Sequence, residues 1–187
     1  MRLFVALQIP DEVRAALIAA TKNLKSEAPD ARWSRPESLH VTLKFLGETK
    51  NDLLERIRET LANCAANSPI ALTYRGVGFF PDEKKPRVLW AGVEATPNLA
   101  ELAAQIDREL KPLGFEPETR PYVPHITLAR LNSARTIEKL VRAAAPLKSY
   151  HFGAARESEF HLFESVLKPT GSEYKKLFTF AFVKEQS

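Results

Sequence analysis

The sequence has little cysteine and little glycine, and it lacks any long apolar run. Its 187 residues include one cysteine, Cys64, and seven glycines. A single cysteine excludes a disulfide within the chain and favours a cytoplasmic location. The apolar stretch in the opening MRLFVALQIP is too short for a signal peptide or a membrane-spanning helix. We therefore expect a cytoplasmic protein without a membrane partner.

Other familiar signals are also missing. No glycines form the phosphate loop of a P-loop protein or of a dinucleotide-binding fold. There is no convincing linker and no low-complexity tract, so we expect residues 1–187 to form a single domain. The formal net charge of +4 is compatible with an anionic substrate.

What the chain does contain is an internal repeat. The segments RPESLHVTLKFL, at 35–46, and RPYVPHITLARL, at 120–131, align at a constant offset of 85 residues. His40 matches His125, and Thr42 matches Thr127. Because a repeat dictates architecture, this pattern predicts two lobes that face each other across a cleft, each with one histidine and one threonine.

The periodicity of apolar residues extends the repeat to whole elements. Each half reads as strand, helix, motif strand, helix, which would fit parallel βαβ units. Without a glycine-rich loop we favour an α+β fold: two pseudo-symmetric, mostly antiparallel sheets with helices on their outer faces and a central cleft. The pattern predicts strands at 1–10, 40–47, 70–80, 86–95, 125–131, 156–166 and 174–183, and helices at 11–24, 53–61, 97–110 and 137–144.

Strand geometry gives the motifs a direction. On a regular strand, His40, Thr42 and Lys44 share one face, while the apolar residues at 41, 43 and 45 point toward the helices. His125 and Thr127 share a face in the same way. A fully buried strand would not repeat a ring nitrogen and a hydroxyl on one face without partners for them. We therefore place both pairs in the cleft rather than in a duplicated core.

Two facing histidines suit acid–base catalysis. One imidazole can take a proton from water while the other gives a proton to a leaving group. Threonine hydroxyls can donate to phosphate oxygens where charge develops. A catalytic zinc usually has three protein ligands, and neither motif brings a Cys, Asp or Glu onto the histidine face. We expect no metal and no other cofactor.

These residues carry a family resemblance. HVTLKFLGE and PHITLAR resemble the paired His-x-Thr-x motifs of the two-histidine phosphoesterase superfamily, and the chain is similar to the RNA 2′,3′-cyclic phosphodiesterases, also called 2′-5′ RNA ligases. The opening MRLFVAL, FFPDEKKPRVLWAGV and FESVLKPTGSEYKKL extend the likeness. The resemblance implies a bilobal fold and metal-independent hydrolysis of a 2′,3′-cyclic phosphate to a 2′-phosphate. It implies a site formed by His40, Thr42, His125 and Thr127.

Three further residues are candidates for substrate binding. Lys44 shares the predicted histidine face, but a solvated lysine fits the pattern equally well. Arg130 would point away from Thr127 on a regular strand, yet it lies at the strand end and the resemblance makes it a candidate phosphate ligand. Phe45 could stack on a base, although core packing explains it as well.

Partners and alternatives follow from the same site. We expect RNA ends or nucleotides with a cyclic phosphate as substrates, and a monomeric protein. From the resemblance we assign His125 as the base on water and His40 as the acid on the 3′ oxygen. Reversible 2′-5′ RNA ligation would use the same site with an RNA hydroxyl as nucleophile. A non-catalytic RNA-binding module is the alternative outside enzymes, and the intact motif residues argue against it.

Overall fold

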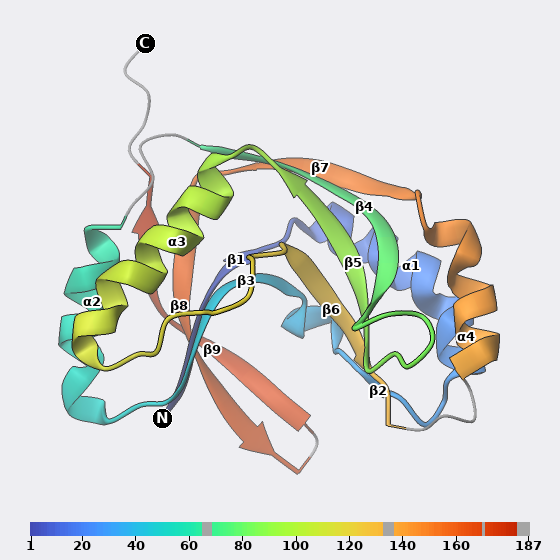
Figure 1. Cartoon of the computed structure of the whole chain (residues 1–187), viewed down its shortest axis with the longest axis horizontal. Coiled ribbons are helices and arrows are strands. Elements are labelled where there is room, and N and C mark those ends of the chain that lie inside the picture. The colour runs from blue at the N-terminus through green and yellow to red at the C-terminus, as the bar shows by residue number, and fades with distance from the viewer. Residues whose placement is uncertain (65–68, 133–136, 170, 183–187) are drawn as a thin grey trace.

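The computed structural model describes residues 1–64, 69–132, 137–169 and 171–182, and it contains two antiparallel sheets with helices on their outer sides (Figure 1). The first sheet has four strands, and the second has five. All strand pairs of the described part are antiparallel. The predicted α+β class with two sheets and outer helices is confirmed.

The described residues form nine strands and four α-helices. The strands are β1 (Arg2–Gln8), β2 (Arg32–Trp33), β3 (His40–Glu48), β4 (Ile70–Phe80), β5 (Val88–Ala95), β6 (His125–Arg130), β7 (His151–Glu157), β8 (Glu159–Lys168) and β9 (Gly171–Ala181). The α-helices are α1 (Asp11–Glu27), α2 (Leu54–Ala62), α3 (Asn98–Leu110) and α4 (Ile137–Ala144). The first sheet has the strand order β3-β1-β8-β9, and the second has the order β2-β6-β5-β4-β7. Apart from β2 and β4, the series β1, α1, β3, α2 recurs as β5, α3, β6, α4, as the repeat predicts.

The helices are exchanged between the sheets. Helix α1 follows β1 of the first sheet but packs against β7 and α4 on the second. Helix α3 follows β5 of the second sheet but packs against β3 and α2 on the first. In each half, the chain therefore crosses to the other sheet to place its helix and crosses back before the motif strand begins. The segment that leads from α1 to β3 is called the first strap (residues 32–38), and the segment that leads from α3 to β6 is called the second strap (residues 114–124).

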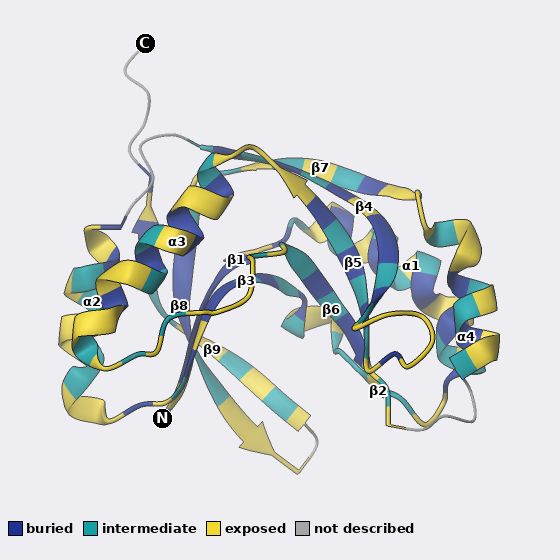
Figure 2. Cartoon of the chain, viewed as in Figure 1, coloured by how far each residue is buried: buried dark blue, intermediate teal, exposed yellow. Residues whose placement is uncertain are grey.

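The buried residues explain why the layers form. The five inner residues of β1, from Leu3 to Leu7, are all buried because this strand lies in the middle of its sheet, under the helices on one face and under aromatic side chains on the other. Helix α3 buries a stripe at three- and four-residue spacing, which is the pattern of a helix with one apolar face. Figure 2 shows the buried residues concentrated between each sheet and its helices.

The sequence prediction was wrong at two places in the fold. The strand expected at 156–166 is two strands, β7 and β8, which belong to different sheets and separate at Ser158. The Ser158 carbonyl accepts a hydrogen bond from the backbone N–H of Phe182, and no glycine or proline marks the break. The short strand β2 was not predicted. The last residue of the strand expected at 174–183 lies outside the described residues.

Candidate active site

Both motif histidines begin their strands and are held in the same way. The backbone carbonyl of Ser38 lies 2.7 Å from His40 Nδ1, and that of Val123 lies 2.7 Å from His125 Nδ1. Because a carbonyl only accepts, each Nδ1 carries a proton and each Nε2 is left for chemistry. Strands β3 and β6 lie against each other, and the pKa of His40 is lowered by burial and, to a smaller degree, by a charge on His125. The two rings therefore act on one another across the two sheets.

A β-bulge interrupts each motif strand at the same place in the repeat. In β3 the pairing with β1 shifts so that Leu43 is the extra residue, and in β6 the pairing with β5 shifts so that Leu128 is extra. Each bulge moves the later side chains to the opposite face. Phe45 and Arg130, which are equivalent in the repeat, consequently share the face of the histidines and threonines. Both are exposed, and Phe45 is 60% exposed.

The prediction that Lys44 shares the histidine face is wrong for the same reason. The bulge turns Lys44 to the helix side, where its side chain is 3% exposed. Its ammonium group donates to the Asp107 carboxylate of α3 and, at 2.9 Å, to the backbone carbonyl of Glu116. A buried cation needs such partners. Lys44 therefore fastens α3 and the second strap to β3, and we do not propose it as a substrate ligand.

Aromatic rings surround His40. The ring of Phe4 lies 4.8 Å from it between centroids, and the ring of Tyr174 contacts it edge-on at 5.3 Å. Phe163 stacks behind Phe4 at 5.2 Å. This burial, together with the charge of His125, lowers the pKa of His40 to about 4, against the opposing effect of the Ser38 carbonyl. His40 is therefore neutral at pH 7 in the free protein.

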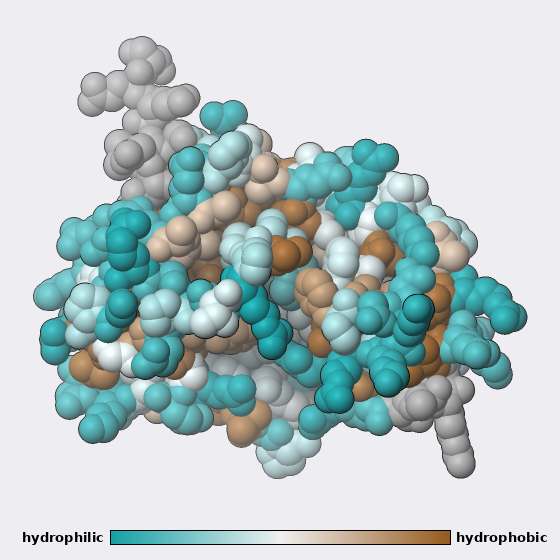
Figure 3. Space-filling model, in the orientation of Figure 1, coloured by the Kyte–Doolittle hydropathy of each residue, from teal (hydrophilic) through white to brown (hydrophobic). Residues whose placement is uncertain are grey.

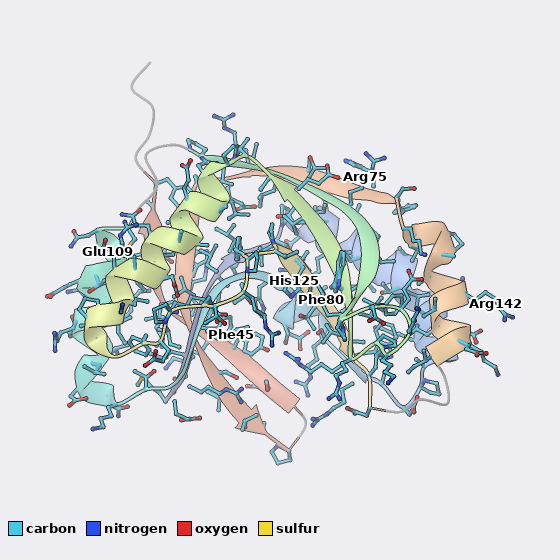
Figure 4. The ribbon with its side chains drawn as sticks, in the orientation of Figure 1. Phe45, Arg75, Phe80, Glu109, His125 and Arg142 are labelled. Atoms are coloured by element: carbon cyan, nitrogen blue, oxygen red, sulfur yellow. The ribbon has the colours of Figure 1, made fainter. Side chains whose placement is uncertain are left out.

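His125 has a lighter aromatic environment. Phe80 contacts it edge-on at 5.0 Å and is itself packed on Trp90 at 5.2 Å. A Cβ atom at Gly78 would lie 2.3 Å from the Trp90 ring, so the absence of a side chain there lets Trp90 lie flat and support Phe80. Figure 4 shows His125, Phe80 and Phe45 in the middle of the molecule, between the two sheets.

The threonine hydroxyls are free, while the threonine carbonyls are not. Neither Thr42 Oγ1 nor Thr127 Oγ1 has a hydrogen-bond partner among the described residues. The Thr127 carbonyl accepts from Ser34 Oγ of the first strap at 2.8 Å, and the Thr42 carbonyl accepts from Tyr122 Oη of the second strap at 3.0 Å. Each strap thus donates a hydrogen bond to one motif strand and then leads into the histidine that begins the other motif strand.

Sequence reasoning missed several of these residues. Phe4 and Tyr174 lie far from the motifs along the chain, so only strand pairing could have placed them beside His40. Ser34 and Tyr122 stand at or inside the repeated segments at positions where the two copies differ, and that difference was the available signal.

His161 and Cys64 are not members of the facing histidine and threonine pairs. His161 is 2% exposed, and its Nδ1 lies 3.0 Å from the hydroxyl of Thr179, as expected for a structural residue. Cys64 is buried, and burial raises its pKa to about 11, which opposes the reactive thiolate. Within the described ranges, no three His, Cys, Asp or Glu side chains are grouped so that they could hold a metal ion. No helix in the described part is long and apolar enough to cross a membrane.

The geometry can now be set beside known proteins. The family model described as the 2′-5′ RNA ligase superfamily matches residues 9–163, a span that includes both motifs. The chain belongs to this superfamily. Two members named RNA 2′,3′-cyclic phosphodiesterase are similar over almost their full length. That of Methanothermobacter thermautotrophicus is 33% identical over 96% of this chain and 98% of its own. That of Thermotoga maritima is 32% identical over 97% and 96%.

Solved structures of the superfamily have the same fold. The protein TT0787 of Thermus thermophilus superposes with a TM-score of 0.83 at 31% identity, covering 100% of both chains. LigT of E. coli, crystallised with 3′-AMP, gives a TM-score of 0.79 at 28% identity and covers 97% of both chains. The superfamily fold therefore extends over the whole of this chain, including the straps and the β8–β9 hairpin.

The aromatic cover of His40 leads to a prediction that needs no substrate. Replacing Tyr174 with alanine should let water reach the ring, so the pKa of His40 should rise from about 4 toward its ordinary 6.5. NMR titration of the imidazole signals measures this shift. The matched control is Tyr150→Ala, which removes an exposed tyrosine that packs on Phe152. An unchanged His40 titration in the Tyr174 variant would show that this ring does not keep water away.

The same variant should change how stability depends on pH. The unfolded chain protonates His40 near 6.5 and the folded protein only near 4. Falling pH through that interval therefore destabilises the wild-type fold, because the unfolded state binds more protons. The Tyr174 variant should lose less stability over the same interval, as measured by urea unfolding.

Proposed function

We propose that the protein hydrolyses 2′,3′-cyclic phosphate ends of RNA or nucleotides to 2′-phosphates, with its two histidines as acid and base and without a metal ion. The near-full-length likeness to RNA 2′,3′-cyclic phosphodiesterases supports the reaction class. The observation that carries the mechanism is the pair of anchored imidazoles, each with its Nδ1 at a carbonyl and its Nε2 available.

The reaction divides into moves that the site can perform. A water oxygen attacks phosphorus while one Nε2 takes its proton. The bond from phosphorus to the 3′ oxygen breaks, and the other Nε2 gives that oxygen a proton, which leaves a 3′-hydroxyl and a 2′-phosphate. The hydroxyls of Thr42 and Thr127 donate to the non-bridging oxygens. Arg130 lies on the same face, at the other end of β6 from His125, and is a guanidinium donor for a phosphate of the substrate. Phe45 offers an exposed ring on which a base can stack.

The charge of the substrate decides whether His40 can be the acid. Its ring is neutral in the free protein because its pKa is about 4, so an acid role requires that binding raise this pKa. An anionic phosphate beside Nε2 favours the imidazolium form and supplies that increase. We therefore keep His40 as the acid on the 3′ oxygen and His125 as the base on water.

The first test is turnover of adenosine 2′,3′-cyclic phosphate in excess chelator. We expect adenosine 2′-phosphate as the product, at a rate that a divalent ion does not increase, because imidazoles and hydroxyls provide all the proton transfers. His40→Ala and His125→Ala serve as inactive controls. Activity that disappears in chelator and returns with a divalent ion would contradict the two-histidine mechanism. Adding an RNA with a 5′-hydroxyl tests ligation, which would appear as a 2′-5′ linked product.

A second prediction separates the two histidines. A ribose 3′ oxygen is a poor leaving group that needs a proton, whereas p-nitrophenolate leaves without one. Replacing the acid should therefore damage hydrolysis of the cyclic phosphate far more than hydrolysis of a p-nitrophenyl phosphodiester, and replacing the base should damage both alike. We expect selective retention in His40→Ala and none in His125→Ala. The reverse pattern would exchange the two roles.

A third prediction concerns the straps. Tyr122→Phe and Ser34→Ala each remove one hydrogen bond to a threonine carbonyl, which should lower stability by about 1 kcal/mol. Because the strap also sets where the other strand's histidine lies, kcat should fall by roughly tenfold with little change in KM. Burial raises the pKa of Tyr122 above its usual range, so the hydroxyl stays a donor across the assay range.

The conservative variant Ser34→Thr keeps a hydroxyl and should recover most of kcat. Tyr150→Phe is the matched control, since Tyr150 is 49% exposed and its ring contacts Phe152 of β7. Steady-state kinetics and urea unfolding measure the two effects. If both strap variants lost stability but kept normal kcat in the folded fraction, the straps would be structural supports only.

A further inference from the structure

An arginine pair lies beside the motif strand of the second sheet. Arg32 of β2 is directly opposite Arg130 of β6 in the antiparallel pairing, and directly opposite residues point to the same face. The bulge at Leu128 puts that face on the side of His125 and Thr127. Both arginines are exposed, while the next residue of β2, Trp33, turns inward.

This arrangement is unfavourable without an anion. Like charges directly opposite on neighbouring strands repel each other and destabilise the pair. The ion pairs of the described residues leave both guanidinium groups without a carboxylate. Two adjacent guanidinium groups offer several donors in a planar fork, which is the arrangement that binds phosphate bidentately. The repulsion would turn into attraction once a phosphate lay between or upon them.

The backbone positions of the pair lie away from the histidine, at the other end of the motif strand. His125 and Arg130 stand at opposite ends of β6, and at about 3.3 Å per residue their Cα atoms are roughly 15 Å apart. That separation suits a second phosphate along a nucleic-acid strand. Figure 3 shows the face drawn in Figure 1 as mostly hydrophilic, with hydrophobic residues in patches between the hydrophilic ones.

We propose that Arg32, together with Arg130, forms a subsite for the phosphodiester on the 5′ side of the terminal nucleotide, so that the protein prefers an RNA end to a free cyclic nucleotide. This proposal rests on the proposed function. Arg32 would then contribute to binding of the substrate and not to the chemical step.

The test compares substrates that differ in the group attached to the 5′ oxygen of the terminal nucleoside. They are adenosine 2′,3′-cyclic phosphate, its 5′-phosphorylated form, the dinucleotide that ends in the same cyclic phosphate, and this dinucleotide with an uncharged methylphosphonate linkage. In the wild type, kcat/KM should be about tenfold higher for the dinucleotide than for the mononucleotide. The methylphosphonate should lose that gain. The 5′-phosphorylated mononucleotide shows whether a terminal phosphate suffices or the subsite requires a diester.

Arg32→Gln should lower the ratio of kcat/KM for the dinucleotide over the mononucleotide by about tenfold. It should also reduce the slope of log kcat/KM for the dinucleotide against log salt by about 0.7, which is what one neutralised phosphate of a single strand contributes. Arg142→Gln is the matched control, because Arg142 is an exposed arginine on the outer helix α4 (Figure 4).

The outcomes distinguish this subsite from the proposed function itself. Failure of the wild type to hydrolyse any of the cyclic phosphates would overturn the proposed function. A wild type that hydrolyses them but treats the dinucleotide and its methylphosphonate alike would overturn the subsite alone. So would an Arg32→Gln variant that keeps the wild-type ratio and salt slope.

Discussion

The site depends on two hydrogen bonds that bind each half of the molecule to the other. Ser34 and Tyr122 donate to the carbonyls of Thr127 and Thr42, from straps that cross between the sheets. A single imidazole can be placed by its own strand, but two imidazoles that share one phosphate need a fixed distance between strands of different sheets. The exchanged helices also hold the two halves together, because each sheet packs against a helix that belongs to the other half of the chain. The lobes therefore cannot separate without breaking both straps and both helix packings.

The two bulges turn a symmetric scaffold into an asymmetric site. Equivalent positions of the repeat carry Phe45 in one motif and Arg130 in the other, and the bulges bring both to the reacting face. An aromatic ring suits a base, and a guanidinium suits a phosphate. A nucleotide end has these two unlike parts on either side of its ribose. In the proposed mechanism, the positions that match between the two copies hold the histidines and threonines that act on the phosphate. The positions that differ, Phe45 and Arg130, recognise different parts of the nucleotide.

The sequence was sufficient for the parts that follow from period and repetition. The constant offset of 85 residues located the motif residues. Alternation along a strand then placed each histidine and its threonine on one face, because they are two residues apart. The faces of Lys44, Phe45 and Arg130 could not be read correctly, since a bulge is a property of pairing with β1 or β5 and leaves no mark within HVTLKFL or HITLARL. The break at Ser158 and the strap contacts depend on which sheet a segment joins. That choice is made by packing over long sequence separations.

The two histidines of the site differ in their aromatic surroundings. His40 lies against Phe4 and Tyr174 and is neutral in the free protein, whereas His125 meets the single ring of Phe80. A buried neutral imidazole acquires its proton most readily when an anion arrives beside it, because the anion offsets the desolvation that had kept the proton away. In the proposed mechanism, binding of phosphate and protonation of His40 are therefore one coupled event.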